Sequence, residues 1–140
     1  MIGVVIATHG DLGSGVLKTA EAACGPQPDI EVVRFSASKS PDDLEKELRE
    51  VIKRKNEGDG VLILTDTFGS SCSNIAKSCL KDNQIEIVTG VNLPMLLDII
   101  MYRPNLSLEE AARKAKQAGQ KAIINVRESL KDEESCPHPE

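Results

Sequence analysis

A histidine and an aspartate each follow a run of apolar residues, at the positions where buried strands would end. The first run, residues 2–8, leads into His9, and the run at residues 61–65 leads into Asp66. A neutral imidazole can act as a base or nucleophile near pH 7, because its reference pKa is about 6.5. A carboxylate is the right chemical type to orient the ring through its other nitrogen. The two residue types therefore indicate an activated histidine, provided that the fold brings them together.

Each of these residues also has an ordinary structural explanation. A single histidine is often a surface residue, and Asp66 could cap the helix expected to follow it. Gly69, Ser70 and Ser71 lie at the start of that helix, where backbone N–H groups and hydroxyls would suit a phosphate but would equally form a plain cap. The position of His9 favours a function, because loops on a rigid scaffold often carry binding and catalytic groups.

Strands and helices are expected to alternate along the chain. The apolar runs that predict strands are residues 2–8, 30–35, 61–65 and 85–91, with a short β-like run at 121–126. The stretches with helical spacing and capping residues are 12–23, 41–57, 70–80, 94–101 and 107–119. This alternation is typical of an α/β fold with a doubly wound, mostly parallel sheet and helices on both faces.

Three loops are expected to lie where such a sheet binds ligands, beyond the carboxyl ends of its strands. They begin at Thr8, Asp66 and Gly90. In the flavodoxin-like strand order 2-1-3-4, the first and third strands are neighbours at the point where the order reverses. His9 and Asp66 would then meet across the crevice.

The composition predicts one domain, over residues 1–130, followed by a polar and disordered tail at 131–140. The net charge is −5 and no basic stripe occurs, so nucleic acid is not an expected partner. The N-terminus lacks a signal-peptide pattern, and the apolar run at 95–101 is too short to span a membrane. The four cysteines form no C-x-x-C pair, which favours reduced thiols and a cytoplasmic location.

Nucleotide and metal sites are not supported by the motifs. The glycines after His9 match neither the P-loop nor the G-x-G-x-x-G pattern. No H-E-x-x-H motif occurs, and the second histidine, His138, lies in the tail. We therefore expect no cofactor.

Three segments together resemble the IIA domain of the mannose-family (mannose, fructose and sorbose) phosphoenolpyruvate-dependent sugar phosphotransferase system. Starting at residues 6, 61 and 86, they read IATHGDLGSGVLKTAE, VLILTDTFGSSCSNIA and EIVTGVNLPMLLD. The similarity extends to about Val126, with the motifs in the right order and at the right separations.

The resemblance implies a phosphohistidine carrier. Such proteins accept a phosphoryl group from the phosphocarrier protein HPr on a histidine that reacts through Nε2. They pass it to a IIB component, which serves a membrane IIC/IID permease. His9 matches the phosphorylated histidine, and Asp66 matches the acid that holds its ring. The residues expected to support the phosphate are Thr8, Gly10, Thr67, Gly69, Ser70 and Ser71.

The resemblance also implies a homodimer, since the family exchanges its last strand between partners. Here residues 121–126 would be that antiparallel fifth strand at the sheet edge. One motif departs from the family: the usual Gly-Gly-Ser-Pro reads Gly69-Ser70-Ser71-Cys72, although Ser71 still aligns with the family serine. We expect no IIB domain to be fused to this one, and the sequence does not name a sugar.

Two other functions remain as alternatives. The first is a regulatory module, in which phosphorylation of His9 controls the affinity for a partner protein instead of sugar transport. The second is a response-regulator-like receiver, phosphorylated on Asp66. A receiver needs an acidic pair after its first strand to bind Mg²⁺, whereas this chain offers a histidine and one acid, Asp11. The receiver is therefore disfavoured.

Overall fold

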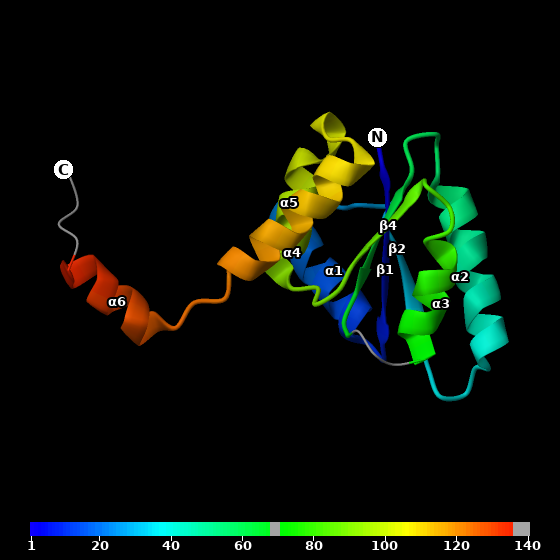
Figure 1. Ribbon diagram of the computed structural model, residues 1–140, viewed down its shortest axis with the longest axis horizontal. Helices are drawn as coiled ribbons and strands as arrows, with labels where there is room; N and C mark the ends of the chain where they lie inside the picture. Colours follow the sequence, from blue (N-terminus) through cyan, green and yellow to red (C-terminus); the bar gives the residue numbers. More distant parts are fainter. Residues whose placement is uncertain (68–70, 136–140) are drawn as a thin grey trace.

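Four parallel strands form one sheet at the centre of the molecule (Figure 1). The computed structural model describes residues 1–67 and 71–135, except for the side chains of residues 71–73 and 134–135. The strands are β1 (Gly3–His9), β2 (Glu31–Phe35), β3 (Val61–Thr65) and β4 (Ile85–Val88). Their order is β2-β1-β3-β4, which confirms the predicted order 2-1-3-4.

Helices cover both faces of this sheet, as predicted (Figure 1). One face carries α1 (Leu12–Cys24), α4 (Leu93–Tyr102) and α5 (Leu108–Lys121), and the other carries α2 (Pro41–Lys55) and α3 (Ser71–Cys79). A 3-10 turn, η1 (Arg103–Asn105), joins α4 to α5, and a last helix, α6 (Val126–Ser135), projects away from the sheet. Within the described ranges, no helix is long and apolar enough to cross a bilayer.

The two central strands are buried on both faces, which is why each reads as a continuous apolar run. Alternate residues of β1 and β3 enter two separate cores. The core beneath α2 and α3 includes Val5, Ala7, Val61 and Ile63. The core beneath α1, α4 and α5 includes Val4, Ile6, Leu62 and Leu64. Packing on both sides holds the two strands in place and thereby fixes where their carboxyl ends lie.

The capping residues expected from the sequence begin the helices. The Ser40 hydroxyl accepts a hydrogen bond from the Asp43 N–H, with Pro41 in the first turn of α2. Ser107 and Glu110 form a reciprocal capping box at the start of α5. Each cap provides an acceptor for an N–H group that the helix itself leaves unpaired.

Residues 121–126 do not form a strand in this chain, contrary to the prediction. Lys121 ends α5, Val126 begins α6, and the residues between them are irregular. A strand needs a neighbouring edge for its backbone N–H and C=O groups, and the structure contains a single chain. The exchange of this segment between two chains therefore stays a prediction.

The helix α6 also extends into the tail that the sequence predicts to be disordered. Residues 131–135 are helical, because α6 runs to Ser135. The side-chain oxygen of Asn125 accepts a hydrogen bond from the Glu128 N–H at 3.2 Å and so caps the start of this helix. The polar composition is thus compatible with a helix, of which residues 131–133 are exposed.

Candidate functional site

The pairing of β1 with β3 brings His9 and Asp66 to the same edge of the sheet. Ala7 lies opposite Thr65 in the parallel register, so both strands reach their last residues together. The His9 Nδ1 atom lies 3.0 Å from Asp66 Oδ2. The His9 side chain is 49% exposed, whereas the Asp66 side chain is only 12% exposed. The imidazole is therefore open to solvent while its carboxylate partner is enclosed.

The Asp66 carboxylate accepts two further hydrogen bonds, both from backbone N–H groups. The His9 N–H donates to Oδ2 at 3.0 Å, and the Thr67 N–H donates to Oδ1 at 2.9 Å. Burial raises the pKa of Asp66, but the hydrogen bonds from His9 and Thr67 outweigh it, so this pKa lies below its ordinary value. Near neutral pH the carboxylate is ionised and can only accept. The His9 Nδ1 atom therefore carries a proton, and in the neutral ring the lone pair is on Nε2.

The lowered pKa of Asp66 predicts how stability changes with pH. The unfolded carboxyl titrates near its reference value of about 3.9, and the folded one titrates lower. The ionised carboxylate therefore stabilises the fold at every pH above about 3.9, and this contribution is lost as the pH falls through the folded pKa. We expect wild type to have a higher free energy of unfolding than Asp66→Asn at neutral pH. Urea titrations should show this difference shrinking as the pH falls from about 4 toward 3.

The loop after β1 is shaped by Thr8 and two glycines. Thr8 is fully buried, and its hydroxyl accepts a hydrogen bond from the Gly13 N–H at 2.7 Å. A Cβ atom on Gly13 would lie 2.8 Å from this same hydroxyl, so α1 can approach β1 only with glycine there. Gly10 has φ +56°, and its N–H donates to the Phe35 carbonyl at 3.3 Å. These contacts make Thr8 and Gly10 supports of the loop that follows His9.

Phe35 is a residue of the site that the sequence analysis does not single out. It is the last residue of β2 and lies opposite His9 in the β1–β2 register. The two ring centroids are 6.0 Å apart with a tilt of 57° between the planes. This buried ring bounds one side of the imidazole, while Asp66 binds its Nδ1. The sequence could have indicated Phe35 as a site residue, because it is the last residue of the strand expected beside the first strand.

The loop after β4 donates backbone hydrogen bonds to the end of β3, next to His9 and Asp66. The Val91 N–H donates to the Thr65 carbonyl at 2.9 Å, and the Gly90 N–H donates to the Asp66 carbonyl at 3.2 Å. The Asn92 side chain then accepts from the Met95 N–H at the start of α4. This loop therefore holds the carboxyl end of β3 in place by backbone hydrogen bonds.

Asn92 also ties α4 to α5, because its side-chain amide donates to the Gly119 carbonyl at 3.1 Å. We expect Asn92→Ala to lower the free energy of unfolding by about 1–3 kcal/mol, since it removes a helix cap and a half-buried hydrogen bond. Urea unfolding followed by circular dichroism measures the loss. The matched control is Asn125→Ala, which removes the cap of the projecting helix α6 and should change global unfolding by less than about 0.5 kcal/mol.

The remaining residues expected at the site lie partly outside the described ranges. Gly69 and Ser70 are not described, and Ser71 begins α3 without a described side chain. The side chain of Cys72 is likewise outside the description. Thr67 is described, and its N–H is engaged by Asp66 Oδ1. Thr67 therefore helps to hold the carboxylate through its backbone.

Comparisons with known proteins show which family the chain is similar to. The family model described as "PTS system fructose IIA component" (EIIA-man) matches residues 3–116. The mannose-specific EIIAB component of Escherichia coli K12 is 32% identical over 124 residues, which are 87% of this chain and 38% of that protein's length. The fructose-specific EIIA component of Bacillus subtilis 168 is 28% identical over 93% of this chain and 90% of that protein.

The fold is shared with solved structures of the same system. The crystal structure of phosphotransferase system component EIIA from Streptococcus agalactiae aligns with a TM-score of 0.82 and 23% identity. The alignment covers 91% of this chain and 99% of that one. The family model covers most of the chain, including both residues of the histidine–aspartate pair. The chain therefore belongs to the mannose family of IIA components of the sugar phosphotransferase system.

Proposed function

We propose that this chain is a phosphohistidine carrier, which accepts a phosphoryl group from phospho-HPr on His9 and passes it to a IIB component. The 3.0 Å hydrogen bond between His9 Nδ1 and Asp66 is the observation that carries this proposal. It orients the ring and leaves the lone pair on Nε2, while half of the His9 side chain is exposed to an incoming protein. The carrier would work in the cytoplasm and reach the IIC/IID permease only through IIB.

The transfer requires one bond to form and one to break. The Nε2 lone pair attacks the phosphorus atom of the donor's phosphohistidine, and the bond from phosphorus to the donor nitrogen breaks with its electron pair returning to the donor ring. His9 keeps its Nδ1 proton and becomes a positively charged phosphoimidazole, which the Asp66 carboxylate stabilises. Transfer to IIB repeats the exchange with His9 as the donor. Positioning and charge stabilisation are what such reactions demand of a protein.

The phosphoryl oxygens need donors of their own. We propose that these donors are groups near the start of α3, where Gly69, Ser70 and Ser71 precede or begin the helix. Backbone N–H groups at a helix N-terminus favour an anion because they lack partners within the helix. No metal or nucleotide is needed for the exchange between two imidazoles.

The deciding experiment measures the mass of the intact protein after incubation with HPr, enzyme I and phosphoenolpyruvate. We expect one added phosphoryl group that is labile in acid and disappears when a IIB component is added. A stable phosphoprotein that transfers to no IIB protein of the same cell would support the regulatory alternative. Folded protein that gains no mass, beside a IIA control that does, would overturn the proposal.

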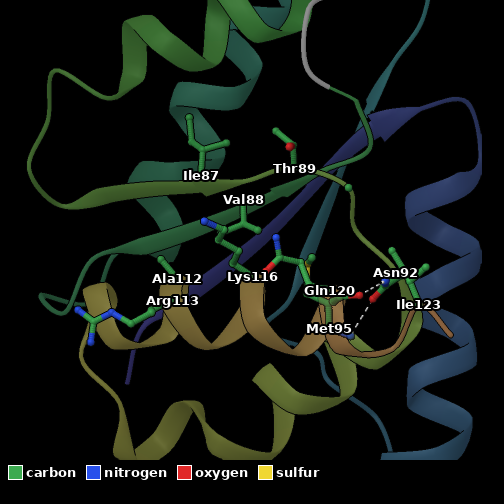
Figure 2. Close-up of a pocket in the computed structure, with 12 residues that line it drawn as sticks. Ile87, Val88, Thr89, Asn92, Met95, Ala112, Arg113, Lys116, Gln120 and Ile123 are labelled. Atoms are coloured by element: carbon green, nitrogen blue, oxygen red, sulfur yellow. Dashed lines mark hydrogen bonds between the residues drawn. The ribbon is translucent and has the colours of Figure 1, made fainter. Parts of the chain in front are cut away.

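We also propose that the carrier is a homodimer in which residues 121–126 pair with β4 of the partner. The strand β4 is the edge of the sheet in the described residues, and an unpaired edge exposes its backbone groups. A groove of about 620 Å³ lies between β4 and α5, and Lys116 and Gln120 extend from α5 toward β4 (Figure 2). Ile123 and Ile124, which follow α5, are largely exposed in the single chain. Exposed apolar residues next to an open edge favour pairing with a second copy.

Sedimentation velocity tests this dimer. We expect wild type to sediment as a dimer and Ile124→Asp to sediment as a monomer with an unchanged circular dichroism spectrum. The control is Met101→Asp, which changes another exposed apolar side chain, at the end of α4, and should stay dimeric. A monomeric wild type at about 50 μM, well above the dissociation constants of stable dimers, would contradict the proposal.

A further inference from the structure

The hydroxyl group of Thr65 is a buried polar group whose role the site has not yet explained. Thr65 is 7% exposed, and its Oγ1 atom has no hydrogen-bond partner among the described residues. In the described part of the chain it is the one buried side-chain oxygen or nitrogen in that condition. Nearly all buried hydroxyls in folded proteins are paired, because leaving one unpaired is costly. An unpaired buried hydroxyl beside a reactive group therefore points to a partner that arrives during function.

The position of Thr65 in the sheet shows which reactive group lies on the same face. Thr65 is the last residue of β3, directly before Asp66, and it lies opposite Ala7 in β1. Side chains alternate along a strand, so Thr65 faces the same side of the sheet as Ile63, and His9 faces the same side as Ala7. Ile63 and Ala7 belong to one core, beneath α2 and α3. Thr65 and His9 are therefore on the same face of adjacent strands.

The separation of the two residues suits a contact through a phosphoryl group. Strands lie about 4.8 Å apart, and two residues along a strand span about 6.6 Å, so the two Cα atoms are separated by about 8 Å. The Thr65 backbone is held by β1 on one side and by the Val91 N–H on the other, at 2.9 Å from its carbonyl. The helix α3, which begins at Ser71, covers this face. Thr65 and His9 therefore lie on the face of the sheet that α3 covers.

We propose that the Thr65 hydroxyl donates a hydrogen bond to the phosphoryl group on His9, an inference that rests on the proposed function. A phosphoryl oxygen carries negative charge, and a hydroxyl that donates to it forms a strong, charge-assisted hydrogen bond. The hydroxyl is without a described partner before phosphorylation, so gaining one favours the phosphorylated state over the unphosphorylated state. Thr65 is then a catalytic residue, because it touches the group that is transferred.

The test compares two variants of Thr65 with one of Thr8. Thr65→Val keeps the shape of the side chain and removes the hydroxyl, and Thr65→Ser keeps the hydroxyl. Thr8→Val removes a buried hydroxyl that already has a partner, the Gly13 N–H at 2.7 Å. For each protein we would measure the single-turnover rate of phosphoryl transfer from phospho-HPr, the half-life of the phosphohistidine, and the Tm of the unphosphorylated form.

We expect Thr65→Val to slow transfer by about tenfold or more, which corresponds to losing one hydrogen bond to a charged group. Thr65→Ser should restore most of the rate. The Tm of unphosphorylated Thr65→Val should equal or exceed that of wild type, because no hydrogen bond is lost, whereas Thr8→Val should lower the Tm.

Two results would overturn the inference. A wild-type rate and phosphohistidine half-life in Thr65→Val would show that the hydroxyl does not contact the phosphoryl group. A slower rate together with a drop in Tm as large as that of Thr8→Val would make Thr65 a structural residue only. Failure of wild type itself to become phosphorylated would instead refute the proposed function, so the two failures are distinguishable.

Discussion

The variant His9→Gln is expected to lose phosphorylation by phospho-HPr while keeping the fold. Removal of Nε2 leaves no acceptor for the phosphoryl group, so we expect the rate to fall by about 10⁴-fold or more, the scale for removing a catalytic nucleophile. The fold should persist because His9 is half exposed at the end of β1 and contributes to neither core. Asp66 would still accept the backbone N–H groups of residues 9 and 67. Intact-mass spectrometry and a thermal melt measure the two outcomes.

The chain provides a matched control for this variant, because it contains only one other histidine, His138. His138→Gln should be phosphorylated at the wild-type rate. The two variants together account for every histidine in the protein. Phosphorylation that survives in His9→Gln, or that disappears in His138→Gln, would contradict the assignment of His9 as the carrier.

The variant Asp66→Asn is expected to slow phosphoryl transfer by about 10²- to 10⁴-fold, the range seen when an orienting carboxylate or a charge-stabilising group is lost. Two effects combine. The asparagine amide can present an N–H group to Nδ1, which favours the tautomer with the proton on Nε2 and removes the attacking lone pair. The variant also lacks the negative charge that stabilises the phosphoimidazole. Single-turnover transfer from phospho-HPr, followed by rapid quench, measures the rate.

The control for Asp66→Asn is Asp11→Asn, at the acid that follows His9 most closely. The Asp11 side chain is 85% exposed and forms a 3.4 Å ion pair with Arg34. Exposed ion pairs contribute little, so we expect the transfer rate to change by less than about twofold. Near-wild-type transfer in Asp66→Asn, or an equal loss in both variants, would refute the orienting role of Asp66.

The fold class and the candidate chemistry could be predicted from the amino-acid sequence. Continuous apolar runs at residues 2–8 and 61–65 can only be buried on both faces, and such strands belong to parallel sheets covered by helices. His9 and Asp66 stand out because a polar residue that ends a buried strand must lie at the sheet edge. Ser40 and Ser107 mark helix starts through local contacts, which depend on residues only three positions away.

Which of these residues come into contact depends on how the strands are ordered in the sheet. The neighbouring positions of β1 and β3 bring Asp66 to His9 across 57 residues of chain, and the same sheet places Phe35 beside the imidazole. The second hydrogen bond to Oδ2, from the His9 N–H, also depends on that pairing. Residues 121–126 have a β-like composition but form no strand in the single chain. A strand also needs a neighbouring sheet edge to pair with, and local composition does not supply one. Local patterns specify elements, whereas contacts between strands depend on how distant segments pack, and the hydrogen bond between His9 and Asp66 is such a contact.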